Sequence, residues 1–355
     1  KGAFETADKI TTVSPTYAKE ILDPWYSYGM DRALVRRQDG IVGILNGIDV
    51  VGYDPETDSN LKKHYSVTKI AGKKECRAAL LHECGLTDSD APVVGIVTRF
   101  VAHKGIQLVQ QTFQEMLQLG CRFVVLGSGE RLYEDFFREM QAEYPDQVHV
   151  TVGFVPAMAR RIYGGADIFL MPSQNEPCGL AQMVAMRYGT IPVVRETGGL
   201  KDSVCPYEAW RDAGTGFTFA NYSSADMLHV IREAVSLYRD DPAAFARLRR
   251  RAMEQDFSWD RSAGEYLKIY AAVTGLSPEK KSARPAAADT TDAPTASGSA
   301  SASEADEKPV LPVKKAAVGK STGKGAKKPA SGKKSAGKAA PAKPKKKGTA
   351  GKAAK

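Results

Sequence analysis

The chain has 355 residues and a formal net charge of +9, which is divided very unevenly along the sequence. Residues 277–355 carry 19 Lys and Arg against 6 Asp and Glu, a net charge of +13, whereas residues 1–276 carry 31 against 35, a net charge of −4. No run of about 18 apolar residues occurs, which excludes a membrane-spanning helix. The sequence therefore predicts an acidic globular part followed by a basic appendage.

The basic appendage lacks the side chains that a folded core needs. From Lys308 to the end there are 16 lysines, no acidic residue and no aromatic residue. Such a segment buries too little apolar surface to offset the entropy lost on ordering, so we predict that 277–355 is disordered, with 277–307 as a linker. The lysines indicate either salt-dependent, non-specific attraction to polyanions such as nucleic acid, or a solvated extension with little function.

The start of the chain and its cysteines bear on where the protein works. The sequence opens at Lys1 without Met and shows no signal-peptide pattern, so we expect that processing or truncation removed the original start. The histidines are isolated, without the spacing of a zinc site. Five cysteines without a CxxC pair predict reduced thiols in a cytoplasm-like compartment. They are Cys76, Cys84, Cys121, Cys178 and Cys205.

From residue 93 onward, strand and helix patterns alternate. Short apolar runs predict buried parallel strands, and the segments between them repeat apolar residues at helical spacing. This alternation predicts an α/β fold, a Rossmann-like doubly wound parallel sheet with helices on both faces. The predicted strands are 93–97, 123–126, 148–152, 168–171 and 191–194, and the helices are 106–117, 130–143, 159–164, 179–188, 225–238, 242–254 and 258–273.

Residues 1–92 are less regular. Segments 7–13 and 41–45 read as short strands, separated by loop-like sequence rich in Tyr, Gly and Asp. We expect this part to be a connector and an edge of structure, not a complete domain.

The carboxyl ends of the predicted strands carry groups suited to a nucleotide diphosphate, since ligands of open α/β sheets bind at that edge. Arg99 and Lys104 lie on one loop and can place a planar guanidinium and a compact ammonium on neighbouring phosphates. Thr197-Gly198-Gly199 precedes a helix, so its unpaired N–H groups can hold a distal phosphate. An arginine after a strand is by itself more often a surface charge. Agreement among several strand ends favours the phosphate site.

Other residues at this edge suit the rest of a nucleotide sugar. Phe154 offers a face on which adenine can stack, although a lone phenylalanine is more often core, and Gly127 ends a strand. Glu176 can accept hydrogen bonds from sugar hydroxyls or can serve only as a charge at a helix start. Cys178 near that helix start reads as a small buried thiol. No Asp/Glu cluster accompanies these groups, so we predict no metal and no cofactor, with positive groups stabilising the leaving group.

Eight strings in the sequence resemble those of bacterial glycogen synthases and plant starch synthases. The resemblance covers residues 1 to about 276, and the strings EPCGL, MRYGT and TGGL are the most specific to this branch. The strings are ADKITTVSPTYA (7–18), ILNGID (44–49), TRFVAHKG (98–105), MPS (171–173), EPCGL (176–180), MRYGT (186–190), TGGL (197–200) and FSW (257–259).

The resemblance implies retaining transfer of glucose from ADP-glucose to the non-reducing 4-hydroxyl of an α-1,4-glucan, with this chain as the donor-binding half of a GT-B fold. It implies catalytic roles for Arg99 and Lys104 on the diphosphate and for Glu176 on the glucosyl hydroxyls. It also implies a bacterial cytoplasmic protein, or a plastid one if the source is photosynthetic. The implied substrate-binding residues are Asn46, Gly127, Phe154, Cys178, Gly179, Leu180, Thr197, Gly198 and Gly199.

The sequence departs from the family in three ways. The second glutamate of the wider Glu-x7-Glu motif is replaced by Val184, with Gln182 as the nearest polar candidate, and Tyr53 stands where Trp is usual. The family's amino-terminal domain, with its Lys-x-Gly-Gly-Leu loop and acceptor-binding histidine, has no counterpart here. We therefore expect 1–92 to be a connector and the end of a truncated acceptor-side domain, and 93–276 to be the nucleotide-sugar-binding domain. The last helix would cross back onto the missing domain.

These expectations leave alternatives open. The chain alone should bind ADP-glucose weakly and extend a glucan hardly at all, so a non-catalytic nucleotide-sugar-binding module is one alternative. A related glycosyltransferase that uses UDP-glucose is another, because the adenine contact depends on Phe154 and backbone groups. A nucleic-acid-associated protein dominated by the basic tail is a third.

Overall fold

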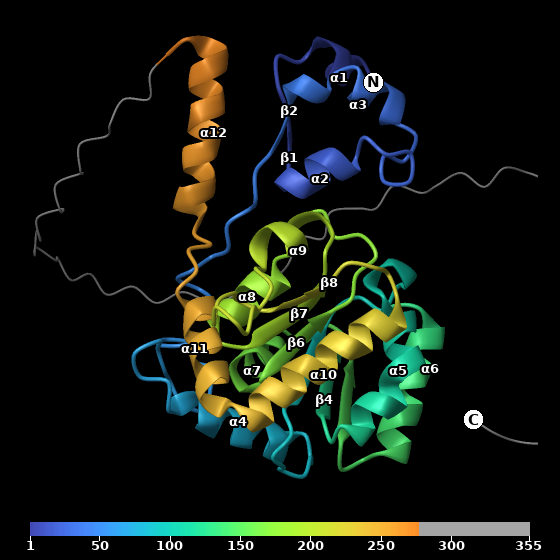
Figure 1. Ribbon diagram of the computed structural model, residues 1–355, viewed down its shortest axis with the longest axis vertical. Helices are drawn as coiled ribbons and strands as arrows, with labels where there is room; N and C mark the ends of the chain where they lie inside the picture. The colour runs from blue at the N-terminus through green and yellow to red at the C-terminus, as the bar shows by residue number, and fades with distance from the viewer. Residues whose placement is uncertain (277–355) are drawn as a thin grey trace, which may run out of the picture. The chain divides into compact units, whose positions relative to one another are not determined.

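The computed structural model describes residues 1–276 (Figure 1). The predicted disorder of 277–355, and the predicted polyanion binding by its lysines, lie outside these described residues. In the described part of the chain, none of the helices combines the length and apolar character that crossing a membrane requires.

A six-stranded parallel sheet forms the centre of the described structure, with the strand order β5-β4-β3-β6-β7-β8. The inner strands β4, β3, β6 and β7 are almost wholly buried, which explains why they appear in the sequence as continuous apolar runs, whereas the edge strand β5 is mostly half-buried. All five predicted strands are confirmed, and the short β8 is an additional strand at one edge. The strands are β3 (Val93–Val97), β4 (Arg122–Gly127), β5 (Val148–Val152), β6 (Ile168–Met171), β7 (Ile191–Arg195) and β8 (Phe217–Phe219).

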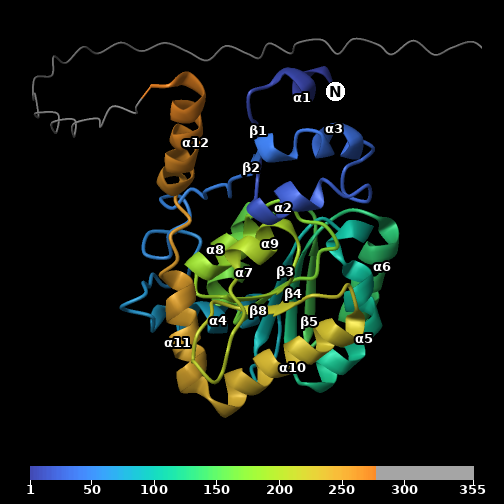
Figure 2. The ribbon, with the colours of Figure 1, turned by 45° about the horizontal axis from the view of Figure 1, so that its top comes forward.

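Helices cover both faces of this sheet, as predicted (Figures 1 and 2). The chain winds from β3 outward to β5, returns to β6 and then continues to β8. In such an order, crossovers of the same hand place the helices of the two halves on opposite faces. Helix α5 packs against α10 in one layer, and α4 packs against α7 in the other. These helices are α4 (Gly72–Glu83), α5 (Ile106–Gln118), α6 (Arg131–Glu143), α7 (Pro156–Gly165), α8 (Ala181–Arg187), α9 (Gly198–Ser203), α10 (Ser224–Asp240) and α11 (Pro242–Met253).

The sequence reading missed helix α4, which belongs to this packed unit. Cys76, Leu80 and Leu81 of α4 are buried in the common core, together with Leu61 and Tyr65 of the preceding loop. Charged residues interrupt the apolar spacing of α4, which hides its helical period. The core of the sheet domain therefore takes in residues that precede its expected start at residue 93.

The first 45 residues form a small separate element. Its two strands pair in parallel with each other and not with the main sheet, which confirms the short strands predicted in 7–13 and 41–45. The element consists of α1 (Gly2–Thr6), β1 (Ile10–Thr12), α2 (Pro15–Glu20), α3 (Asp31–Val35), the 3-10 helix η1 (Gln38–Gly40) and β2 (Ile41–Gly43).

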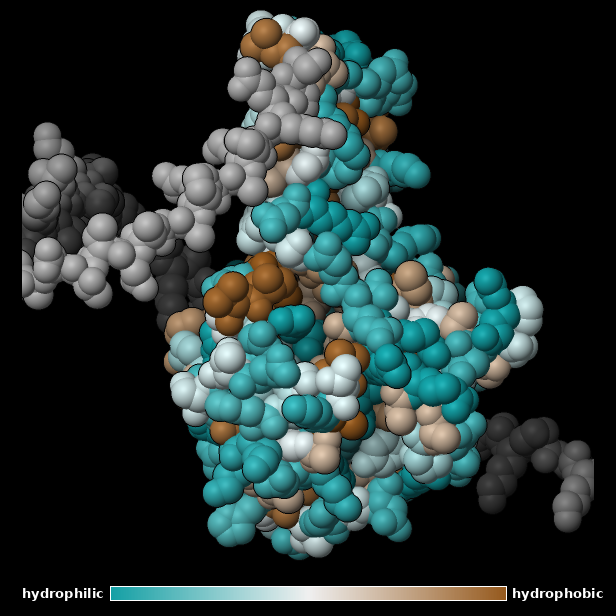
Figure 3. All heavy atoms as spheres, turned by 90° about the vertical axis from the view of Figure 1, so that its left-hand side faces the viewer, coloured by the Kyte–Doolittle hydropathy of each residue, from teal (hydrophilic) through white to brown (hydrophobic). Residues whose placement is uncertain are grey.

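Two chain segments run side by side where this element joins the sheet domain. The Ile48 amide donates to the Phe257 carbonyl oxygen at 2.8 Å, and the Ser262 hydroxyl donates to the Leu45 carbonyl oxygen at 2.6 Å. The last helix, α12 (Trp259–Thr274), follows directly, and Ser262 is its one buried residue. Several apolar side chains of α12 and the residues after it lie at the surface (Figure 3): Trp259, Leu267, Tyr270, Val273 and Leu276.

Candidate donor site

A cavity of about 240 Å³ opens where β3, β4 and β5 end. Arg99, Gly127 and Phe154 all line it, so three residues predicted from separate strand ends lie together. Phe154 is 90% exposed, which excludes the alternative that it belongs to the core. A Cβ on Gly127 would lie 1.9 Å from the Thr98 carbonyl oxygen, so this close approach of two strand ends requires glycine.

Lys104, on the loop after β3, and Glu176, on the loop after β6, form an ion pair. The Lys104 Nζ lies 2.5 Å from Glu176 Oε2, and the Ser173 hydroxyl donates to the same oxygen at 3.1 Å. Both charged side chains are largely shielded from solvent, with exposures of 15% and 11%. Gly105 makes the pairing sterically feasible, because it has a φ of +75° and a Cβ there would lie 2.0 Å from the Pro172 carbonyl oxygen. It follows the 3-10 helix η2 (Ala102–Lys104) and lets that turn lie against the end of β6.

The pKa of His103 responds to the charges at the carboxyl ends of the strands. Burial lowers the pKa of His103 below its ordinary value, and the nearby charges of Lys104 and Arg99 lower it further. Glu176 and Glu130 oppose this shift but do not cancel it. Arg99 and Lys104 thus act on one small region, as two groups that hold one diphosphate should.

The loop 197–199 lies against the loop that carries Glu176. The Gly199 amide donates to the Glu176 and Pro177 carbonyl oxygens at 3.1 and 3.2 Å. A Cβ on Gly198 would lie 2.1 Å from the Glu176 carbonyl oxygen, and one on Gly199 would lie 2.0 Å from that of Cys178. Both glycines are therefore required for the contact between the two loops.

The expectation that the N–H groups of this loop are unpaired is wrong. The Glu20 carboxylate of α2 accepts from the Gly198 amide at 3.0 and 3.1 Å and from the Thr197 hydroxyl at 3.0 Å. Because Thr197 is fully buried, its side chain contacts protein and not solvent. The sequence reading missed Glu20, which lies far away in the chain on a helix that it did not predict.

Cys178 and Asn46 are also close to each other. Burial raises the pKa of the Cys178 thiol, which the Asn46 backbone amide partly opposes, so this thiol is the inert, buried group that the sequence suggested. Gly179 has a φ of +68°, where an L side chain would be strained, and it turns the chain into Leu180 at the start of α8. Leu180 is 48% exposed at this surface.

Gln182 does not take the place of the missing second glutamate. It is fully buried, and its Nε2 donates to the Cys178 and Gly179 carbonyl oxygens at 3.2 and 3.0 Å and to the Ser203 hydroxyl at 3.0 Å. Val184 belongs to the core. Gln182 therefore holds the backbone of Cys178 and Gly179 in place from within the core.

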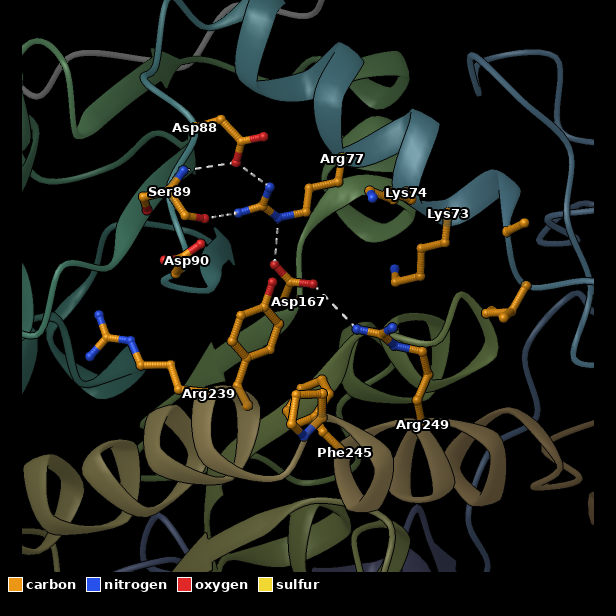
Figure 4. Close-up of a pocket in the computed structure, with 14 residues that line it drawn as sticks. Lys73, Lys74, Arg77, Asp88, Ser89, Asp90, Asp167, Arg239, Phe245 and Arg249 are labelled. Atoms are coloured by element: carbon orange, nitrogen blue, oxygen red, sulfur yellow. Dashed lines mark hydrogen bonds and ion pairs between the residues drawn. The ribbon is translucent and has the colours of Figure 1, made fainter.

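A larger cavity, of about 1060 Å³, lies at the other edge of the sheet, near the amino ends of β3 and β6 (Figure 4). Three of the charged side chains that line it are paired with one another: Asp167 accepts from Arg77 at 3.0 Å and from Arg249 at 3.2 Å. Lys73 is buried beneath it and donates to the Tyr188 carbonyl oxygen at 2.9 Å and to the Thr190 hydroxyl at 2.8 Å. These contacts hold α4 and α11 to the sheet. Within residues 1–276, no three His, Cys, Asp or Glu side chains are grouped to hold a metal ion.

Comparison with known proteins agrees with this geometry. The glycosyl transferases group 1 family matches residues 81–252, and the starch synthase catalytic domain family matches residues 1–36. The glycogen synthase of Desulforudis audaxviator is 46% identical over 270 residues, covering 76% of this chain and 54% of that protein. The glycogen synthase of Geobacillus stearothermophilus is 48% identical over 271 residues, covering 76% of this chain and 56% of that protein. The chain belongs to the glycogen and starch synthase family of glycosyltransferases.

A solved structure supports the same assignment. The catalytic domain of starch synthase IV from Arabidopsis thaliana, bound to ADP and acarbose, superposes with a TM-score of 0.72 and 35% sequence identity. The match covers 78% of this chain and 57% of that one. The resemblance read from the sequence is thereby confirmed, as is the GT-B type of its parallel sheet. The chain spans little more than half the length of the curated relatives that it matches.

Proposed function

We propose that this chain supplies the donor-binding half of a glucan synthase that transfers glucose from ADP-glucose to the non-reducing 4-hydroxyl of an α-1,4-glucan, with retention of configuration. The observation that carries the proposal is that Arg99 lines one cavity with Phe154, while Lys104, on the same loop, pairs with Glu176, and all three charges act on His103. Two cations and a carboxylate within one small region match a diphosphate next to a sugar.

Each of these residues has a distinct role in the proposed reaction. The bond between glucosyl C1 and the diphosphate oxygen breaks and its electron pair leaves on ADP, while the acceptor 4-oxygen forms the new bond to C1 and passes its proton to the departing diphosphate oxygen. Arg99 and Lys104 stabilise the negative charge that develops on the departing diphosphate. Glu176 accepts hydrogen bonds from glucosyl hydroxyls and so fixes the sugar for attack by the acceptor hydroxyl. When the donor binds, its diphosphate offers Lys104 a second anionic partner besides Glu176.

The remaining predicted residues complete the proposed donor site. Adenine stacks on Phe154 and lies against Gly127, while the turn of Cys178, Gly179 and Leu180 borders the sugar. Asn46 closes the site from the connector. The Gly198 amide already donates to Glu20 and so is not available to a phosphate. We therefore propose that residues 197–199 hold the Glu176 loop in place and do not contact the distal phosphate directly.

The acceptor side of the cleft lies beyond the described residues in this proposal. Helix α12 exposes Leu267, Tyr270 and Val273, a row of apolar side chains that another domain of the same polypeptide would cover. Its glucan acceptor would bind between that domain and the donor site. We also propose a reducing, cytoplasmic setting, since all five cysteines are free and four of them are buried.

The test is calorimetric titration of the 355-residue chain with ADP-glucose, ADP and UDP-glucose. We expect ADP-glucose and ADP to bind weakly and UDP-glucose to bind more weakly than either. Stronger binding of UDP-glucose would reassign the donor, and no binding of any of the three would overturn the proposed site. Family-like glucan synthesis by this chain alone would contradict the proposal that a second half-site is needed.

A further inference from the structure

The short helix α2 is tied by hydrogen bonds to both loops of the candidate donor site. The Ser14 hydroxyl, at the N-cap of α2, donates to the Pro177 carbonyl oxygen at 2.7 Å, and Ser14 is fully buried. The backbone amide and the hydroxyl of Thr16 donate to the two carboxylate oxygens of Asp202 on α9, at 2.7 and 2.6 Å. Figures 1 and 2 both place α2 directly beside α9.

Glu20, at the other end of α2, completes this attachment. Its carboxylate accepts from the Gly198 amide and from the buried Thr197 hydroxyl, and no cation pairs with it among the residues that the structure describes. Two neutral donors on one loop therefore satisfy the charge of Glu20 in place of a basic side chain. We refer to Ser14, Thr16 and Glu20 as the α2 clasp.

The α2 clasp crosses the boundary between the two matched families. Residues 1–36 match the starch synthase catalytic domain, whereas residues 177, 198 and 202 lie within the range that matches group 1 glycosyl transferases. A helix from the first range thus holds the loops that the second range places at the donor site. The donor site is accordingly not built by its own domain alone.

The clasp acts on Glu176 through a short chain of contacts. Glu20 fixes the Gly198 amide, and the neighbouring Gly199 amide donates to the Glu176 carbonyl oxygen at 3.1 Å. Gly198 also has no room for a Cβ beside the Glu176 carbonyl, so the two loops are closely packed at this point. A shift of 197–199 therefore shifts the backbone that carries the Glu176 carboxylate.

From this arrangement we propose that Glu20 is a positioning residue for the glucosyl group of the donor, acting through Gly198 and Gly199 on Glu176. This inference rests on the proposed function. It predicts that loss of Glu20 weakens binding of the sugar more than binding of the nucleotide, because Arg99 and Phe154 do not depend on the 197–199 loop.

Calorimetric titration of Glu20→Ala with ADP-glucose and with ADP tests this. We expect the Kd for ADP-glucose to rise about tenfold, which corresponds to the loss of one hydrogen bond to a charged group. The Kd for ADP should change less than about threefold. Lys19→Ala is the matched control, since Lys19 is exposed on the same helix and its side chain makes no hydrogen bond or ion pair with either loop in the described structure. Glu20→Gln should restore most of the affinity, because its amide oxygen still accepts from Gly198.

The controls separate this inference from the proposed function. If the wild-type chain binds neither ADP-glucose nor ADP, the proposed function fails. If wild type binds both and Glu20→Ala binds ADP-glucose equally well or more tightly, Glu20 has no positioning role. Equal losses for ADP and ADP-glucose, or an equal loss in Lys19→Ala, would show a general structural effect and would also overturn the inference. Should Glu20→Ala fail to fold, Glu20→Asp provides the same comparison with a smaller expected loss, because the shorter side chain draws the carboxylate away from the Gly198 amide.

Discussion

The two ends of the central sheet both gather charged side chains, but the charges at each end have different partners. At the amino ends of the strands, Asp167 is 5% exposed and is shared between Arg77 and Arg249. At the carboxyl ends, Arg99 is exposed at a cavity, and Lys104 is paired with a single carboxylate, Glu176. Charges that are fully paired within the chain hold the fold together, whereas charges with room for another partner are available to a ligand.

Cavity size would have pointed to the wrong end of the sheet. The cavity of about 1060 Å³ is lined by the paired side chains of Arg77, Asp167 and Arg249, and the cavity of about 240 Å³ is lined by Arg99 and Phe154. The pairing of the surrounding side chains is therefore more informative here than volume. Variants at either end of the sheet test this distinction.

Removing the cations at the carboxyl edge should abolish most of the chemistry and leave the fold intact. If the proposed function holds, Arg99→Ala and Lys104→Ala, in a polypeptide that joins this chain to an acceptor-side domain, should each lower the turnover of ADP-glucose by roughly a hundredfold to a thousandfold, because charge on the leaving diphosphate loses a stabilising group. The rate of ADP release measures this, and the thermal unfolding midpoint should stay near that of wild type for Arg99→Ala.

Arg131→Ala is the control for these variants, since Arg131 is 91% exposed at the start of α6. It should leave turnover unchanged. Normal turnover in both Arg99→Ala and Lys104→Ala would remove these residues from the site, and the contrast between the two edges would lose its functional meaning.

Removing the shared carboxylate of Asp167 at the amino ends of the strands should destabilise the fold and leave ADP binding intact. Asp167→Ala leaves Arg77 and Arg249 without their common partner and the Val93 amide without an acceptor, so we expect the free energy of unfolding to fall by about 3–5 kcal/mol. Urea denaturation measures this change. Asp88→Ala, which removes an Arg77 partner that is 64% exposed, should cost less than about 1 kcal/mol.

The two variants also test whether the amino edge is purely structural. Folded Asp167→Ala, measured at low temperature, should bind ADP with the affinity of wild type. A large loss of ADP affinity without a loss of stability would show that the cavity of Figure 4 belongs to the functional site.

Much of this organisation could be predicted from the sequence, because it depends on local patterns. Buried parallel strands appear as continuous apolar runs, and in such a sheet Arg99, Gly127 and Phe154 must follow neighbouring strands at one edge. The structure brings these three together around one cavity. The donor loops could be found for the same reason, since their residues lie close to strand ends.

The features that the sequence reading missed depend on contacts between distant segments. No local signal shows that Glu20 reaches Gly198, which is 178 residues away, or that Asp167 binds arginines on both α4 and α11. The Lys73 amine in α4 reads as a solvated charge, yet it is buried on backbone carbonyls. Such pairs can be identified only in the folded structure, where segments that are distant in the sequence lie next to one another.

The smallest expected effect is a pH dependence of ligand binding at the carboxyl edge. The charges of Lys104 and Arg99 help to hold the pKa of His103 below its ordinary value of 6.5, after the larger effect of burial. A bound diphosphate would offset those two charges and raise the pKa of His103. The complex would then take up protons, so His103 should make ADP affinity rise as the pH falls through the range just below 6.5.

Comparison of wild type with His103→Asn isolates this contribution, since the phosphates of ADP titrate equally in both titrations. We expect the ratio of the two ADP affinities to change by about twofold to fivefold between pH 7.5 and pH 5.5, in favour of wild type at the lower pH. At the amino edge no such dependence should arise, because the charges of Asp167 and its arginines are paired with or without ligand. A ratio that stays constant with pH would mean that the diphosphate does not bind near Lys104 and Arg99, and the proposed difference between the two edges would then have to be abandoned.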